Sequence, residues 1–286
     1  MASSKPHELN ETELERILAG IDIPPCPGTV TAVMTEAQKE SPDINVLTRI
    51  IAGDVGMSAF ALKLANSTLF RRGAATDNVA QAVARLGTRN LLCIVISVAL
   101  RDSMAGNLPA EFLDRFWSRS NGTALAAGMV ARKLRGIPAD QAYTYGLFHD
   151  AAIPVLMRRF ADYGDALEEA RAGDRPLTEI EDARYQCTHA VVGALLARNW
   201  GLPRVLSDAI RFHHSADIYA SGGHGLTPLT LSLIATVHVA EKLMTDLNGE
   251  KQEEISDLYA GAVAYLGLDD DDLRDLAEDL TEALHQ

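Results

Sequence analysis

The sequence predicts an all-α protein, because two observations recur along its 286 residues. Apolar residues repeat at spacings of three and four through most of the chain, which is the period of an amphipathic helix. Residues that favour helix starts (Asp, Asn, Ser, Thr) and helix ends (Gly, Pro) separate these stripes at short intervals. We expect a short polar helix, an N-terminal lobe, a second lobe and an acidic helical extension, over residues 1–20, 21–105, 106–216 and 217–286.

The N-terminal lobe is predicted to consist of short helices with clear boundaries. Asp54 is the expected N-cap of one helix, and Asp77 or Asn78 caps the next, which ends at Gly87. The run over 88–99 is rich in β-branched residues, so its pattern alone also fits a buried strand. Its threonine cap and its helical neighbours favour a buried helix.

The remaining helices are predicted by similar signals. The helix after the long one at 111–135 carries His149 and Asp150, and Pro154 marks either a kink or the first turn of its continuation. Thr188 is the expected N-cap of a later helix, and Pro203 is the expected N1 residue of the one that follows. Three further helices are expected near the C-terminus, over 229–247, 253–265 and 272–284.

The formal net charge of −13 is unevenly distributed. From Asp246 onward, thirteen acidic residues face only two basic ones, a balance of −11. Between Val55 and Arg101, six basic residues face one acidic residue, a balance of +5. We call this second segment the basic shoulder. The predicted helix over 272–284 has leucines at spacings of three and four, so we expect it to dock on the body, with the shoulder as one candidate dock.

Composition predicts a cytoplasmic protein without a membrane partner. The longest apolar run, 91–100, is about half of the ~20 residues that a membrane-spanning helix needs. The first residues lack the apolar segment of a signal peptide. The three cysteines have no metal-ligand spacing and fit a reducing compartment: Cys26, Cys93 and Cys187.

The stretch from Tyr143 to Met157 contains the adjacent pair His149-Asp150 within an apolar run. An imidazole and a carboxylate both need partners once they leave water. The pair is therefore either part of a metal or phosphate site, or a hydrogen-bonded polar pair at a helix end.

Several motifs occur around this pair in a characteristic order. They are IPPCPGTVTAVM (23–34), ALKLANSTLF (61–70), GLFHD (146–150), HAVVGALLARNWGLP (189–203) and AIRFHH (209–214). Together they resemble the HDOD domain, a bacterial signalling-output relative of the HD phosphohydrolases, over roughly residues 20 to 216. The resemblance implies a multi-helix HDOD fold.

In HD enzymes an earlier histidine, the His-Asp doublet and a later aspartate hold a divalent metal ion. The resemblance places Arg119 at the first of these positions and Glu241 at the last. Because a guanidinium has no lone pair to donate, the expected site is a degenerate HD site without a metal or other cofactor: Arg119, His149, Asp150 and Glu241. Arg119 is then expected to pair with Asp150 and to replace the lost positive charge.

Two further groups of residues allow more than one interpretation. Three histidines fit core or helix-end roles, although related dinuclear HD enzymes use histidines in such places, so they are candidates for a residual site: His189, His213 and His214. Five basic residues are candidates for an anion-binding patch, or form a solvated face or a partner for the acidic helices: Lys63, Arg71, Arg72, Arg85 and Arg89.

The predicted function is a non-catalytic bacterial signalling-output or protein-interaction module with a signalling protein as its partner. The main alternative is a metal-dependent phosphohydrolase that acts on a nucleotide or cyclic dinucleotide. A third hypothesis is a nucleic-acid-binding regulator, which the pI of about 5.0 disfavours.

Overall fold

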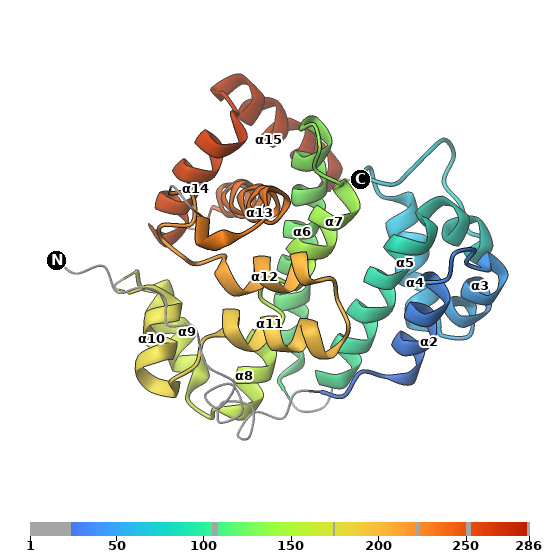
Figure 1. Cartoon of the computed structure of the whole chain (residues 1–286), viewed down its shortest axis with the longest axis horizontal. Helices are drawn as coiled ribbons and strands as arrows, with labels where there is room; N and C mark the ends of the chain where they lie inside the picture. The colour runs from blue at the N-terminus through green and yellow to red at the C-terminus, as the bar shows by residue number, and fades with distance from the viewer. Residues whose placement is uncertain (1–23, 105–107, 174, 221–222, 250–252, 285–286) are drawn as a thin grey trace.

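A computed structural model of the chain is an assembly of helices, shown in Figure 1. The structure describes residues 24–104, 108–173, 175–220, 223–249 and 253–284, so the polar helix predicted within 1–20 lies outside the described residues. Those ranges contain fourteen α-helices, one short 3-10 turn at Gly223–Gly225 and no strand. The all-α prediction is therefore confirmed.

The first four helices lie together, on the right in Figure 1. They are α2 (Gly28–Ala37), α3 (Ile44–Ala52), α4 (Val55–Asn66) and α5 (Val79–Met104). The side chain of Asp54 accepts the N–H of Met57 at 2.8 Å, as an N-cap should, and the Asn78 side chain caps α5. Gly87 breaks α5 with a φ of 72°, and the chain bends by 115° there. The run after Gly87 is helical, so the strand alternative is wrong.

The second group of helices includes α6, the long helix predicted over 111–135. Its members are α6 (Ala110–Lys133), α7 (Ala139–Phe148), α8 (Ile153–Arg159), α9 (Tyr163–Arg171), α10 (Leu177–Tyr185), α11 (His189–Asn199) and α12 (Arg204–Phe212). A Cβ on Gly146 of α7 would lie 3.0 Å from the Cα of Ala124 in α6. Glycine therefore lets the two helices cross closely. The N-cap prediction for Thr188 is confirmed, whereas Pro203 precedes the first helical residue of α12, so its N1 assignment is wrong.

The chain turns where one helix was predicted to carry both His149 and Asp150. Helix α7 ends at Phe148, His149 is its C-cap, and Asp150 lies in the tight turn before α8. Pro154 occupies the first turn of α8, where its missing N–H costs little. The prediction of one helix that carries both residues is therefore wrong, whereas the expectation that Pro154 lies in a first helical turn is confirmed.

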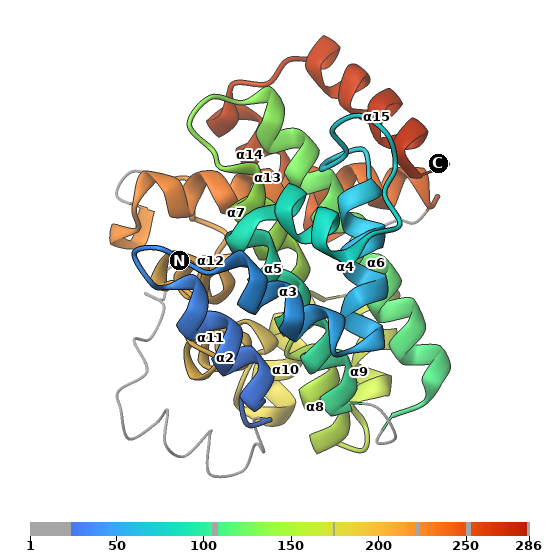
Figure 2. The same ribbon diagram turned by 90° about the vertical axis from the view of Figure 1, so that its right-hand side faces the viewer.

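The C-terminal part begins with a helix that is integral to the body. Its helices are α13 (Pro228–Leu247), α14 (Glu253–Leu266) and α15 (Asp270–Leu284). Helix α13 packs against α6, α7, α12 and α14. Figure 2 shows α13 running across the upper half of the molecule beneath α15, and Figure 1 shows it nearly end-on, with α14 beside it and α15 above.

Helix α15 docks on the body, as its leucine spacing predicted. Leu276 and Leu280 are each 1% exposed, whereas Leu284 at the end of the helix is exposed. The cation placed against its acidic face is Lys133, whose Nζ lies 3.4 Å from Asp275 Oδ2 and 3.5 Å from Asp279 Oδ2. Because Lys133 belongs to α6, the cation that α15 contacts here lies outside the basic shoulder.

Within the described ranges, no single helix is long and apolar enough to cross a membrane. Two bent pairs of helices reach that length and composition together, α3 with α4 and the two halves of α5.

We expect the docking of α15 to depend on its leucines more than on its charges. Leu280→Ala should lower the free energy of unfolding by about 2–5 kcal/mol, because it leaves a cavity in a buried contact. Lys133→Ala should lower it by less than ~1 kcal/mol, because the carboxylates that it pairs with are mostly exposed. Urea unfolding of both variants measures this. A larger loss for the lysine variant would contradict the packing described here.

Candidate functional site

Asp150 lies where helix ends from three separate parts of the chain meet. The turn between α7 and α8 carries His149 and Asp150, the start of α11 carries His189, and the end of α12 is followed by His213 and His214. Helix α13 adds Glu241. The structure thus brings together all three histidines predicted as a residual site and three of the four residues of the predicted degenerate site.

Each of three imidazoles has its Nδ1 held by an oxygen atom. The Nδ1 of His149 lies 2.8 Å from the carbonyl of Gly146, and that of His213 lies 2.6 Å from the carbonyl of Ile210. The Nδ1 of His189 lies 2.8 Å from Glu181 Oε2. Because a carbonyl oxygen can only accept, His149 and His213 carry their proton on Nδ1. The opposite nitrogen, Nε2, is then the atom that faces the site.

The three Nε2 atoms converge on the carboxylate of Asp150. That of His149 lies 3.3 Å from Oδ2, and those of His189 and His213 lie 3.3 Å and 3.6 Å from Oδ1. The Nε2 of His213 is buried and makes no hydrogen bond. A lone pair of a ring nitrogen therefore faces a carboxylate oxygen across a gap, an arrangement that needs a positive charge between the two atoms.

The ligand atoms form two groups that share Asp150. One group contains His149, Asp150 and Glu241, and in it the Nε2 of His149 lies 3.2 Å from Glu241 Oε1. The other contains Asp150 and the remaining three histidines of the cluster, His189, His213 and His214. Within each group all candidate ligand atoms lie within 4.8 Å of one another. Each group is therefore compact enough to hold one metal ion.

The electrostatics of the cluster are dominated by burial and by the two carboxylates. Burial opposes the charged form of both acids, yet contact with His149 lowers the pKa of Glu241 to about 2 and that of Asp150 well below its usual value. Burial also opposes an imidazolium at His149, but Asp150 and Glu241 raise its pKa well above the usual value. Burial and the neighbouring His214 lower the pKa of His213 to about 3.

A second set of hydrogen bonds, on the side away from Asp150, holds His189 and His213 in place. Glu181 of α10 is completely buried and accepts the hydroxyl of Tyr163 as well as two N–H groups of His189. His238 of α13 lies between the carbonyl of His213 and the hydroxyl of Tyr219, at 2.7 Å from each. Sequence reasoning missed both residues. His238 carries a signal, since it is a polar residue within an apolar run, whereas Glu181 lies among other charged residues of α10 and carries none.

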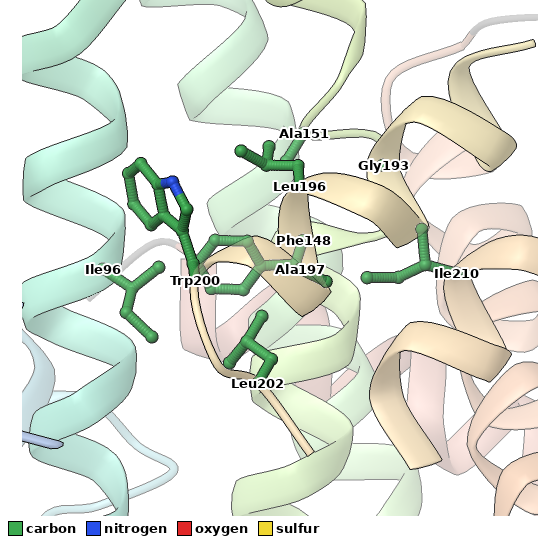
Figure 3. Close-up of a pocket in the computed structure, with 9 residues that line it drawn as sticks. All are labelled: Ile96, Phe148, Ala151, Gly193, Leu196, Ala197, Trp200, Leu202 and Ile210. Atoms are coloured by element: carbon green, nitrogen blue, oxygen red, sulfur yellow. The ribbon is translucent and has the colours of Figure 1, made fainter. Parts of the chain in front are cut away.

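A narrow apolar cavity lies behind the cluster, between α5 and the second group of helices. It leaves no room for a water molecule, and Figure 3 shows Ile96, Trp200 and Ile210 among the side chains around it. A Cβ on Gly193 would lie 2.9 Å from a methyl group of Ile210 and 3.7 Å from the carbonyl of His149. Glycine here lets α11 approach both the turn and α12, which brings His189 to Asp150.

The remaining predicted site residues lie elsewhere. Arg119 is half-buried on α6. The Arg119–Asp150 contact stays a prediction. In the basic shoulder, Lys63, Arg71 and Arg72 are exposed, while Arg85 donates to the carbonyls of Ala65 and Ala74 and so holds the loop before α5. The side chain of Arg89 lies outside the described part of the chain.

Comparison with solved structures supports the fold. An HDOD domain protein of unknown function from Geobacter sulfurreducens is 20% identical, with a TM-score of 0.69 over 94% of this chain and 93% of that one. A candidate phosphohydrolase from Shewanella amazonensis SB2B is 22% identical, with a TM-score of 0.68 and the same coverage. A candidate signal-transduction protein from Marinobacter aquaeolei VT8 is 19% identical, with a TM-score of 0.66 over 96% of this chain and 64% of that one. At these identities the likeness shows the fold alone.

Comparison by sequence identifies the family. An uncharacterised protein from Treponema pallidum (strain Nichols) is 26% identical over 219 residues, which are 72% of this chain and 41% of that protein. This chain therefore spans less than half the length of that relative. The HDOD domain model matches residues 23–216, about two thirds of the sequence. The chain belongs to the HDOD domain family.

Proposed function

We propose that this chain binds divalent metal ions around Asp150 and uses them to hydrolyse a phosphoester. The observation that carries this proposal is the convergence of three Nε2 atoms on one carboxylate, with each Nδ1 held by an oxygen. Histidines that bind metals are held in this way, because the contact at one ring nitrogen fixes the orientation of the other.

The residues present fit divalent transition metals. Imidazole nitrogens and carboxylate oxygens suit zinc, manganese and iron. The buried Nε2 of His213, which has no hydrogen bond, is the atom that a metal ion would satisfy. One ion would be held by His149, Asp150 and Glu241. A second ion would be held by the remaining three histidines together with the shared Asp150. A bound metal ion lowers the pKa of a bound water molecule and polarises a phosphate ester.

The chain's own residues determine the side from which a substrate approaches. The ring of His149 is 4% exposed and those of His189 and His213 are 1% exposed, whereas the side chain of Asp150 is 24% exposed. The side chain of Glu241 is 13% exposed. The two carboxylates and the partly exposed His214 thus form the accessible edge of the cluster, and the other three histidine rings form its buried base. A phosphoester would approach along this edge.

This proposal replaces the expectation of a metal-free degenerate site. That expectation followed from one missing histidine, at the position of Arg119, in a set of four ligands. The two groups contain six side chains in all, Asp150 included, and need no ligand at Arg119. A candidate phosphohydrolase among the similar structures supports the proposed chemistry.

The second candidate is a non-catalytic signalling-output module in which the cluster serves structure or regulation alone. Two observations favour it: Arg119 at the place of a ligand in HD enzymes, and a similar structure of a candidate signal-transduction protein. Nucleic-acid binding has less support, because Arg85 of the basic shoulder is engaged with backbone carbonyls.

We expect purified protein to bind divalent transition metal at the Asp150 cluster. Asp150→Asn should abolish tight binding, because Asp150 belongs to both groups, whereas Glu241→Gln should weaken only the group that contains His149. His224→Ala is the matched control. His224 belongs to neither ligand group, and its Nε2 lies 2.9 Å from Asp217 Oδ1. Elemental analysis after metal loading and desalting measures the content. Equal metal content in wild type, Asp150→Asn and His224→Ala would contradict the assignment.

Turnover separates the two candidates. Metal-loaded wild type should hydrolyse a generic nitrophenyl phosphomonoester or phosphodiester, and His189→Ala should lose the activity because it removes a ligand. Arg119→Ala should keep both metal and activity. A protein that binds metal stoichiometrically but hydrolyses neither ester nor a panel of nucleotides and cyclic dinucleotides would support the non-catalytic candidate instead.

A further inference from the structure

Glu181 is a buried acid that contacts His189 of the cluster around Asp150 and the hydroxyl of Tyr163. Its side chain is 0% exposed and comes from α10, a helix that contributes no residue to either ligand group. Its Oε2 lies 2.8 Å from the ring Nδ1 of His189 and accepts the backbone N–H of the same residue at 3.0 Å. Its Oε1 accepts the hydroxyl of Tyr163, which is also completely buried.

This arrangement gives His189 one orientation. With the ring fixed at Nδ1 and the backbone fixed at N–H, the Nε2 lies 2.9 Å from His214 Nε2 and 3.3 Å from Asp150 Oδ1. Tyr163 begins α9, Glu181 lies in α10 and His189 begins α11, so one carboxylate connects three helices at the point where the cluster is built. Burying a carboxylate is costly unless its contacts are good, and here its oxygens are satisfied by three donors.

We propose that Glu181 is a positioning residue of the metal centre, which orients the His189 ring and increases its strength as a ligand. The inference rests on the metal binding proposed above and extends it to residues that do not touch the metal. The negative charge of Glu181 polarises the Nδ1–H bond, so that more electron density is available at Nε2. Tyr163 in turn fixes the rotamer of Glu181.

A simpler alternative is that Glu181 only caps α11. The carboxylate accepts the N–H of the first residue of that helix, and negative charge is stabilising at a helix N-terminus. The neighbouring Thr188 performs a capping role without touching the ring, since its hydroxyl accepts the N–H of Val191 at 3.3 Å. Thr188→Ala is therefore a matched control that separates the two roles.

The test is the affinity of metal-stripped full-length protein for Zn²⁺ or Mn²⁺, measured by competition with a chromophoric chelator. Glu181→Gln keeps the length of the side chain and an acceptor but removes the charge. It should lower the metal affinity of the group that contains His189 by about 10–100-fold. Glu181→Asp keeps the charge but withdraws it from the ring, and should also weaken binding. Thr188→Ala should lower the melting temperature and leave the affinity unchanged.

Each outcome decides the inference. Equal affinity in wild type and Glu181→Gln, with metal bound by both, would overturn the positioning role and leave the proposed function intact. No metal binding by the wild type would overturn both. If Glu181→Gln does not fold, Tyr163→Phe is measured instead. It retains the ring, removes one donor to Glu181 and should give a smaller loss of affinity, whereas an unchanged affinity would overturn the role.

Discussion

The contact of Asp150 with three histidines is the constraint on which the second half of the structure depends. A carboxylate largely removed from water needs donors or cations, and here its partners come from the α7–α8 turn, from the start of α11 and from the end of α12. Helix α13 adds a second acid against His149. Because four segments meet at one cluster of charged and polar side chains, their relative positions are set together. The site and the core of this lobe are therefore the same structure.

Close approach at this junction requires small residues at particular places. Gly146 lets α7 cross α6 at backbone contact, which places the end of α7 where His149 turns inward. Gly193 lies one helical turn after His189 on the same face of α11 and lets that face approach Ile210 and the carbonyl of His149. Both glycines act through the absence of a Cβ. The geometry of the cluster thus depends on close helix packing at Gly146 and Gly193, neither of which is itself a candidate ligand.

Features set by local chemistry could be predicted from the sequence. Asp54 and Thr188 were predictable caps, because a cap depends on residues within three positions of it. The break at Gly87 was predictable because a positive φ favours glycine. The turn at His149 could not be predicted, because Ala151 and Ala152 are typical of a continuing helix. The chain turns there because Asp150 contacts partners more than thirty residues away in the sequence.

Each of His189 and His213 fitted a core position when considered alone, and only the tertiary structure shows that their Nε2 atoms face one carboxylate. Glu241 was placed through its family resemblance, whereas Glu181 was missed because its contact with His189 crosses from one helix to another.

A crystal structure of the metal-loaded protein, with anomalous diffraction measured at the absorption edge of the metal, would show whether the Asp150 cluster binds metal. We expect anomalous density beside Asp150, bound by His149 and Glu241 on one side or by His189, His213 and His214 on the other. Each ring should bind through Nε2, with Nδ1 still held by its oxygen partner. Density confined to surface carboxylates, with the histidines and Asp150 joined only by hydrogen bonds, would contradict this expectation.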